Sequence, residues 1–358
     1  MGQGTVKLGS IYGIDIELHW SLLLLLLITT LLLAGGAPLL FLIIVLLFIC
    51  VFLHELAHSV TSMKNGIKVR EIVLNLIGGA SIIDETKMGP AEEFNISIVG
   101  PITSLLLGGI FGVFVIFAPQ GFPTLILQLL FELNMLLGVS NILPAFPMDG
   151  GRVMRSYLQK TRSRFDATMA TVRISEYTIG LLVIGAFAYL LLTSYSFVYK
   201  EIVFFIFAFV AFFLYDGAQS EKQMALLRRD TSGLNISGAV SRNYLMTSSS
   251  ATVEELYERM QKSKKHIFVI ALPEGYAIVD LFRRRSEGAE HAGELAIKVE
   301  TLGPETSALD ALVKTESGAG VAVVARKAKP IGITTSQQLQ ALVYLHVMKK
   351  KKEKGLKG

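Results

Sequence analysis

The stretch Phe52-Leu53-His54-Glu55-Leu56-Ala57-His58 decides how the chain is organised. It has the pattern HExxH and lies within an apolar run long enough to cross a bilayer. At 3.6 residues per turn, His54 and His58 lie about 40° apart on one helix face, where both imidazoles can bind a single Zn²⁺. Glu55 lies roughly 60° beyond His58 around the same helix. The pattern therefore predicts a metal site in which Glu55 acts as general base on a water molecule.

The same three side chains can also form an ion-paired helix face that holds no metal. In a hydrocarbon setting, however, two histidines and a glutamate are costly and usually have a function. The membrane setting therefore favours the metal site.

The composition indicates that setting. The chain has 358 residues, of which 52% are hydrophobic, against about 45–50% in an average protein even when glycine is counted. Its mean hydropathy is +0.53. Apolar residues concentrate before about residue 216 and charged residues after it. We therefore expect an α-helical polytopic membrane protein domain at residues 1–215, followed by a soluble half.

Six apolar runs predict six transmembrane helices, at Trp20–Ala34, Leu39–Lys64, Phe94–Ala118, Thr124–Leu143, Tyr177–Tyr195 and Ile202–Tyr215. Gly35-Gly36-Ala37-Pro38 should form a tight turn, and residues 152–176 should form a basic connector.

Two segments break the helical pattern. Residues 5–18 are expected to form a short strand, and Val69–Asp84 one or two strands, which together give a small membrane-associated β-sheet. The free edge of the second segment can pair with an extended peptide, which makes it a candidate rail for a substrate. A simple connector is the alternative.

A second motif, from Asn141 to Gly151, offers a third metal ligand. Pro144 and Pro147 end the preceding helix. Asp149 comes after these prolines and stands directly before the pair Gly150-Gly151. Asp-Gly is also a common turn dipeptide. A Zn²⁺ held by two histidines needs a third protein ligand, and a carboxylate at the end of a neighbouring span would leave the fourth position for water.

Other polar residues in the membrane half have less specific interpretations. His19 can approach the metal or mark the membrane interface beside Trp20. Glu132 is an intramembrane carboxylate for which a structural and a functional role are both open. Cys50 is expected to be a small buried residue.

The charges of the loops predict the orientation. Basic residues gather at the loops on one side of the predicted spans, so the positive-inside rule places both termini and the soluble half in the cytosol of a multi-pass cell-membrane protein. His54 lies ten residues before Lys64, about 15 Å by helical rise. Asp149 follows a span that ends on the same side. All three candidate ligands are therefore expected at one depth, toward the cytosolic face.

With these residues, the chain resembles the site-2 protease family of intramembrane zinc metalloproteases over most of residues 11–215. The motifs that carry the resemblance are the HExxH pattern, the NxxPxxPxDGG pattern of Asn141 to Gly151, Ile14 to Ser21, Gly78-Gly79-Ala80 and Gly100-Pro101.

The resemblance implies that His54, His58 and Asp149 bind one Zn²⁺ per chain and that Glu55 activates water. It also implies that Asn141 polarises the scissile carbonyl or holds the substrate strand, whereas an asparagine that merely ends a helix is the alternative. The implied substrates are transmembrane segments of membrane proteins, cleaved within or near the bilayer in regulated intramembrane proteolysis.

The soluble half contains two similar units at an offset of about 55 residues. After a linker at 216–235, residues 236–348 resemble a tandem cystathionine-β-synthase (CBS) domain pair, an α/β module that often binds adenine nucleotides, and 349–358 form a basic tail. Gly332 and Thr335 match that family's glycine and threonine, but Gln338 replaces its ribose-contacting aspartate. The corresponding positions of the first repeat hold Ala277, Asp280 and Arg283. These replacements favour a dimerising or substrate-docking role over nucleotide binding.

Three functions compete. The leading hypothesis is an intramembrane metalloendopeptidase, and the alternatives are a CBS-gated ion transporter or channel and a non-catalytic membrane scaffold. Transporters typically contain inverted repeats, and we find no convincing repeat within residues 1–215. A scaffold should have lost Glu55. The expected partners are a transmembrane protein substrate, the lipid bilayer and a second copy joined through the CBS pair. No nucleic-acid partner is expected.

Overall fold

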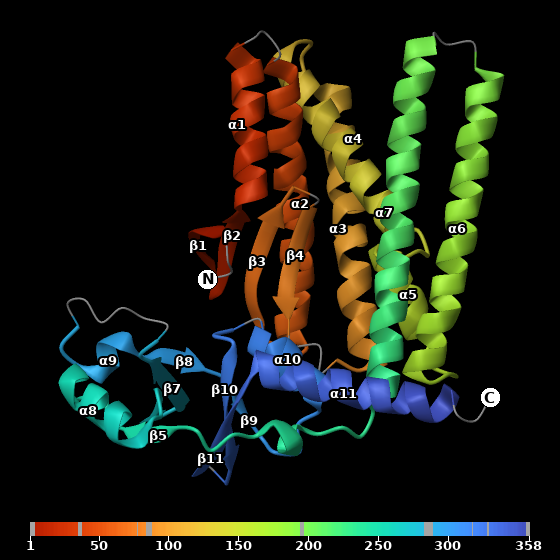
Figure 1. The fold of residues 1–358 in the computed structure, drawn as a ribbon. Coiled ribbons are helices and arrows are strands. Elements are labelled where there is room, and N and C mark those ends of the chain that lie inside the picture. The colour runs from red at the N-terminus through yellow and green to blue at the C-terminus, as the bar shows by residue number, and fades with distance from the viewer. Residues whose placement is uncertain are drawn as a thin grey trace. The chain divides into compact units, whose positions relative to one another are not determined.

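The computed structural model describes residues 4–34, 38–76, 78–83, 88–193, 197–282, 289–316, 318–327 and 329–355. The chain divides into two compact units, Met1–Ala225 and Leu226–Gly358 (Figure 1).

The first unit contains a four-stranded sheet in the order β1 (Thr5–Ile11), β2 (Ile14–His19), β3 (Val69–Asn75), β4 (Gly78–Ile83). The pair β1–β2 is antiparallel, β2–β3 is parallel and β3–β4 is antiparallel, so β4 is an edge strand. Alternating residues of the sheet, such as Ile14, Ile72 and Leu74, join the helix residues Leu22 and Val51 in one buried cluster. The sheet therefore packs against the first two helices.

Both predicted strand segments contain two strands. In the first, Tyr12 and Gly13 turn the chain with φ of 52° and 79°, where a single strand was expected. In the second, the turn separates β3 from β4, and Asp84 lies outside the described residues.

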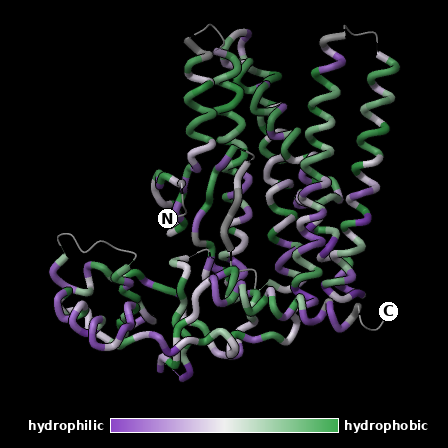
Figure 2. The backbone as a smooth tube through the Cα atoms, viewed as in Figure 1, coloured by the Kyte–Doolittle hydropathy of each residue, from purple (hydrophilic) through white to green (hydrophobic). Residues whose placement is uncertain are grey.

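The helices of this unit are α1 (Trp20–Ala34), α2 (Pro38–Lys64), α3 (Pro90–Phe117), α4 (Phe122–Ile142), α5 (Asp149–Leu158), α6 (Arg164–Leu192) and α7 (Phe197–Asp230). Figure 2 shows apolar residues along most of the length of the long helices. Five described helices are long and apolar enough to cross a membrane. The prediction of a multi-pass α-helical membrane protein is confirmed.

The predicted count of six spans is not confirmed. Helix α1 has the predicted bounds, but its 15 residues give about 22 Å of helix against about 30 Å of hydrocarbon. The turn predicted at Gly35-Gly36-Ala37-Pro38 falls largely on residues 35–37, which lie outside the described residues.

Helices α6 and α7 extend far beyond their predicted bounds, and α3 begins four residues before its predicted start. Helix α6 begins at Arg164 because Ser163 caps it: the Ser163 Oγ accepts a hydrogen bond from the Asp166 backbone N–H at 3.1 Å. Most of the predicted connector 152–176 is therefore helical, in α5 and α6. Helix α7 continues through polar residues to Asp230, so the segment expected to be a linker is helical up to that residue.

The second unit has two sheets, each with strands from one repeat. One has the order β5 (Leu245–Thr247), β6 (Ile267–Leu272), β7 (Gly275–Asp280), β8 (Ile297–Val299), and the other has β11 (Lys329–Thr335), β10 (Val321–Arg326), β9 (Thr301–Leu302). The helices of the unit are η2 (Ile236–Ala239), α8 (Val253–Ser263), α9 (Ala292–Leu295), α10 (Ala308–Glu316) and α11 (Ser336–Gly355). The repeated strand–helix–strand–strand order agrees with the predicted CBS pair.

Residues of both sheets pack together in one buried cluster, which includes Ile267, Val269, Val323 and Ile333. These residues are strongly apolar and β-branched, as expected for strands with two covered faces. The two repeats are therefore joined by a common core.

Candidate metal centre

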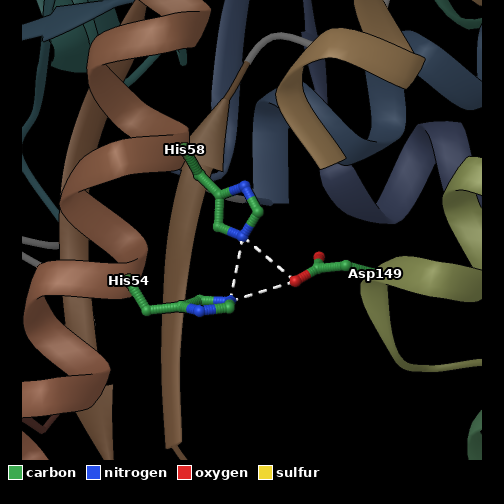
Figure 3. Close-up of side chains that lie close together, drawn as sticks. All are labelled: His54, His58 and Asp149. Atoms are coloured by element: carbon green, nitrogen blue, oxygen red, sulfur yellow. Dashed lines mark hydrogen bonds and ion pairs between the residues drawn. The ribbon is translucent and has the colours of Figure 1, made fainter. Parts of the chain in front are cut away.

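His54, His58 and Asp149 converge at one point in the first unit (Figure 3). The Asp149 Oδ2 lies 3.0 Å from the His54 Nε2 and 3.1 Å from the His58 Nε2, and the two Nε2 atoms are 3.1 Å apart. Both imidazoles are buried, and the Asp149 side chain is 17% exposed. Two residues of α2 and the first residue of α5 thus present three donor atoms to the same small space.

The second ring nitrogen of each histidine contacts α3. The His58 Nδ1 donates to the Ile96 carbonyl at 2.6 Å, and the His54 Nδ1 lies 2.9 Å from the Ser104 Oγ. Because a carbonyl accepts but cannot donate, His58 carries a proton on Nδ1, and Nε2 is the ring nitrogen that faces Asp149. Such contacts fix the tautomer and ring orientation that a metal ligand needs.

Gly100 lets α3 approach the histidines closely. A Cβ on Gly100 would lie 2.2 Å from the His58 Nε2 and 2.7 Å from the His54 Nε2. Any side chain at this position would therefore collide with the ligand atoms. In the Gly100-Pro101 motif, the missing side chain of Gly100 leaves the space that the two imidazole rings fill.

Asp149 is placed by a tight return of the chain between α4 and α5. A Cβ on Gly150 would lie 2.2 Å from the Ile142 carbonyl oxygen, and one on Gly151 would lie 2.8 Å from the Phe146 nitrogen. The glycine pair thus permits α5 to begin directly against the end of α4. The carboxylate reaches the histidines for this reason.

Glu55 lies next to the edge strand β4. A Cβ on Gly79 would be 2.4 Å from the Glu55 Cγ, so the β4 backbone rests against the Glu55 side chain. Helical geometry places this carboxylate beside the two histidines of α2. The candidate base and the edge of the sheet are therefore neighbours.

Asn141 lies near the end of α4 (Phe122–Ile142). Its Nδ2 donates to the Leu137 carbonyl at 2.9 Å. The residue lines a cavity of about 240 Å³ between α3, α4 and α5, together with Phe94, Ile98, Pro101, Ile142, Pro144, Gly150, Val153, Met154 and Tyr157. Its predicted role in substrate binding stays a prediction.

The other polar residues singled out in the sequence lie outside the cluster. The His19 Nδ1 lies 2.8 Å from the Ser21 Oγ. Glu132 is exposed on α4 and accepts a hydrogen bond from the Gln128 Nε2 at 2.9 Å. Cys50 is buried, as expected, and accepts a hydrogen bond from Asn134.

The sequence reasoning missed the residues that orient the ligands. Ser104 looks like an ordinary polar residue in a span, although small polar residues commonly form hydrogen bonds between membrane helices. It also missed Arg155, which is 5% exposed and bonded to two carboxylates. Arg155 falls in the segment predicted to be a basic connector, and its burial depends on contacts with Glu93 and Glu221, which are distant in sequence.

The donor set fits zinc. Two imidazole nitrogens and a carboxylate oxygen are usual ligands of a catalytic zinc site with an open fourth position. Tetrahedral ligands at 2.0–2.1 Å from Zn²⁺ are about 3.3 Å from one another. The observed spacings of 3.0 to 3.1 Å are close to that value, so a small outward shift would accommodate the ion.

Comparisons with known proteins show which family the chain resembles. The model of peptidase family M50 matches residues 42–126 and 118–185, which include the HExxH and Asn141–Gly151 motifs. The chain is 30% identical to the zinc metalloprotease MJ0392 of Methanocaldococcus jannaschii over 264 residues, which cover 73% of each chain.

The chain belongs to peptidase family M50. It is a metalloprotease of the site-2 protease type, and the transporter and scaffold alternatives are not favoured. A solved site-2 protease from Methanocaldococcus jannaschii is 31% identical, with a TM-score of 0.46, and covers 61% of this chain and 95% of its own. A conserved CBS domain protein of Thermoplasma acidophilum is 12% identical, with a TM-score of 0.26, and covers 33% of this chain and 76% of its own.

Proposed function

We propose that this chain hydrolyses peptide bonds within or near the transmembrane segments of other membrane proteins. In this proposal His54, His58 and Asp149 hold one Zn²⁺, and Glu55 is the general base. The observation that carries the proposal is the convergence of three donor atoms from α2 and α5 within an apolar helical unit. Polar groups in such surroundings are costly and usually have a function.

The metal and Glu55 divide the chemistry. When bound, zinc acts as a Lewis acid that lowers the pKa of water to about 7 and stabilises negative charge on the attacked carbonyl oxygen. The Glu55 carboxylate takes a proton from the attacking water while the water oxygen bonds to the carbonyl carbon. Glu55 then gives that proton to the amide nitrogen as the carbon–nitrogen bond breaks. The second proton of the water stays on the new carboxyl group, so the products are a carboxylic acid and an amine.

We propose that the substrate lies in an extended form along β4. This strand ends the four-stranded sheet, and its Gly79 rests against Glu55. Pairing with the edge would satisfy the backbone of an unwound membrane segment and present its carbonyls to the site. Asn141 is assigned to binding the same extended segment.

The proposal includes a topology and a division of the chain. Both termini and the second unit lie in the cytosol, because the basic residues gather at loops on one side. Residues 1–215 form the protease domain, and residues 236–348 form the CBS pair. Water would then reach the metal centre from the cytosolic face.

For the second unit, dimerisation or substrate docking is favoured over nucleotide binding. The Thr335 N–H donates to the Gln338 Oε1 at 3.1 Å, and the Gln338 N–H donates to the Thr335 Oγ1 at 3.2 Å. This reciprocal pair is a capping box at the start of α11, in which the oxygen of each side chain accepts a backbone N–H. In the first repeat, the Asp280 Oδ1 accepts the Phe282 N–H, and Arg283 lies outside the described residues.

The test is cleavage of a membrane-embedded substrate by the purified full-length protein in detergent. We expect zinc chelation to abolish cleavage and zinc addition to restore it. Glu55→Gln should keep the metal and lower turnover by about 10²- to 10⁴-fold, the usual contribution of a general base.

Glu132→Gln is the matched control, because it neutralises another carboxylate in a predicted span and leaves the metal centre intact. It should cleave at the wild-type rate. Undiminished turnover by Glu55→Gln would refute the proposed mechanism.

A further inference from the structure

The loop just before Asp149 contacts both α6 and α7. The Phe146 backbone N–H donates to the Ser175 Oγ of α6 at 3.0 Å. The fully buried Phe146 side chain packs with Val172 of α6 and Ala218 of α7. The residues just before the metal ligand are therefore fixed by the last two helices of the unit.

Helix α7 contacts this segment at two places one helical turn apart. A Cβ on Gly217 would lie 2.5 Å from the Pro147 Cδ, so the α7 backbone rests on the proline ring. Four residues later, the Glu221 Oε2 accepts a hydrogen bond from the Arg155 Nη1 at 2.7 Å. Pro147 lies two residues before Asp149, and Arg155 lies on the helix that Asp149 begins.

Arg155 also ties α5 to α3. Its Nε donates to the Glu93 Oε1 at 2.8 Å, its Nη2 donates to the same oxygen, and the Gln159 Nε2 donates to the Glu93 Oε2 at 2.9 Å. Glu93 and Arg155 are 2% and 5% exposed. Burial alone would lower the pKa of the Arg155 guanidinium, but the charges of Glu93 and Glu221 raise it above its ordinary value. The guanidinium is therefore a fixed charge at the junction of three helices.

The same helix α3 orients the histidine ligands. It carries Glu93 at its start, and then Ile96, Gly100 and Ser104, which contact His54 and His58. Arg155 thus connects the helix behind the histidines, the helix that begins with Asp149, and α7. Helix α7 itself runs without a break to Asp230, past the end of the first unit at Ala225.

We propose that Glu221 and Gly217 of α7 are positioning residues for the metal ligand Asp149. Glu221 acts through Arg155, and Gly217 acts through Pro147. A displacement of α7 would then move the carboxylate relative to the two histidines and weaken metal binding. This inference rests on the proposed zinc site, but it concerns the placement of the ligand and not the peptide hydrolysis.

The test measures zinc affinity in the full-length protein in detergent, by competition with a chelating dye. The visible absorption of bound Co²⁺ adds a second readout, because it depends on the geometry of the ligands. We expect Glu221→Gln to raise the zinc dissociation constant about tenfold, as loss of a group that orients a ligand typically does. It should also change the Co²⁺ spectrum and lower kcat with little change in KM.

Gly217→Ala is a second variant, which leaves every charge in place and pushes α7 away from Pro147. It should lower zinc affinity as well. If Glu221→Gln does not fold, the zinc affinity of Gly217→Ala tests whether α7 positions Asp149. Asp216→Asn is the matched control, since it removes an exposed carboxylate from the same helix. It should leave zinc affinity and the Co²⁺ spectrum unchanged.

Wild-type zinc affinity and an unchanged Co²⁺ spectrum in the folded variants would overturn the inference. A wild-type protein that binds zinc but cleaves no substrate would instead refute the proposed function, and the positioning claim would still be decided by the affinities.

Discussion

The metal centre of the first unit and the junction between β11 and α11 at Thr335 in the second unit, called the Thr335 turn below, both have polar side chains near a tightly packed glycine. These glycines are Gly100 and Gly332. At the metal centre the polar atoms come from two helices, α2 and α5, and the second ring nitrogen of each histidine contacts α3. At the turn, Thr335 and Gln338 bond to each other within one segment, and Gly332 makes room for Val240 and Ser241. Side chains that bond to each other locally, as Thr335 and Gln338 do, have fewer acceptor atoms left for a ligand. At the metal centre, α3 contacts one ring nitrogen of each histidine, and the other ring nitrogen faces the space shared with Asp149.

The largest expected effect is that of removing a ligand. Asp149→Asn replaces the carboxylate with an amide, which is a poorer zinc ligand. We expect turnover to fall by at least about 10²-fold, because loss of a group that merely orients a ligand already costs 10- to 100-fold. Metal analysis of the purified variant should show loss of zinc, and a full zinc content with normal turnover would contradict the assigned ligand.

A smaller loss is expected when a group behind a ligand is removed. Ser104→Ala deletes the hydroxyl 2.9 Å from the His54 Nδ1, and zinc affinity should fall about tenfold. Thr178→Val is the matched control, since its hydroxyl donates to the Ile174 carbonyl within α6. Equal zinc affinities in Ser104→Ala and Thr178→Val would contradict the role of α3 in orienting His54.

A core substitution in the second unit should lower the stability of that unit without changing the zinc affinity of the first unit. Leu339 is fully buried in the core of the second repeat, and Leu339→Ala should lower the free energy of unfolding of that unit by about 2–5 kcal/mol. Hydrogen exchange of the β10 and β11 amides should accelerate, while that of α2 and α5 should not. Loss of zinc from this variant would contradict the expectation that metal binding in the first unit does not depend on the stability of the second unit.

The smallest effect is expected from a nucleotide. Because the capping box occupies Thr335 and Gln338, ATP should change turnover by less than the roughly fivefold that allosteric coupling typically gives at its lower end. Titration calorimetry and a cleavage assay with and without ATP provide the measurement. Tight binding with a large change in rate would show that the capping box opens.

Much of the first unit could be predicted because its signals are local. The bounds of α1, α2 and α4 agree with their apolar runs to within two residues, since glycine, proline or polar residues end each run. The HExxH motif also depends on one helix alone. Asp149 could be added because two prolines and a glycine pair mark the end of a span on the same side.

The rest depends on contacts that local sequence does not encode. The polar residues after Tyr215 resembled a linker, but they continue α7, and Glu221 is bonded to Arg155, 66 residues away. The start of α6 was missed although Ser163 and Asp166 form a recognisable cap. The role of Gly100 as the residue that admits α3 to the ligands follows from three-dimensional packing alone.

The most direct test of the central claim combines zinc content with the position of the cut. Full-length wild-type protein and Glu55→Gln are reconstituted in liposomes with a membrane-spanning substrate, and the products are mapped by mass spectrometry. We predict one zinc per chain in both proteins, and a cut within or next to the apolar segment by the wild type alone. Cleavage by zinc-bearing Glu55→Gln at the wild-type rate would contradict the account.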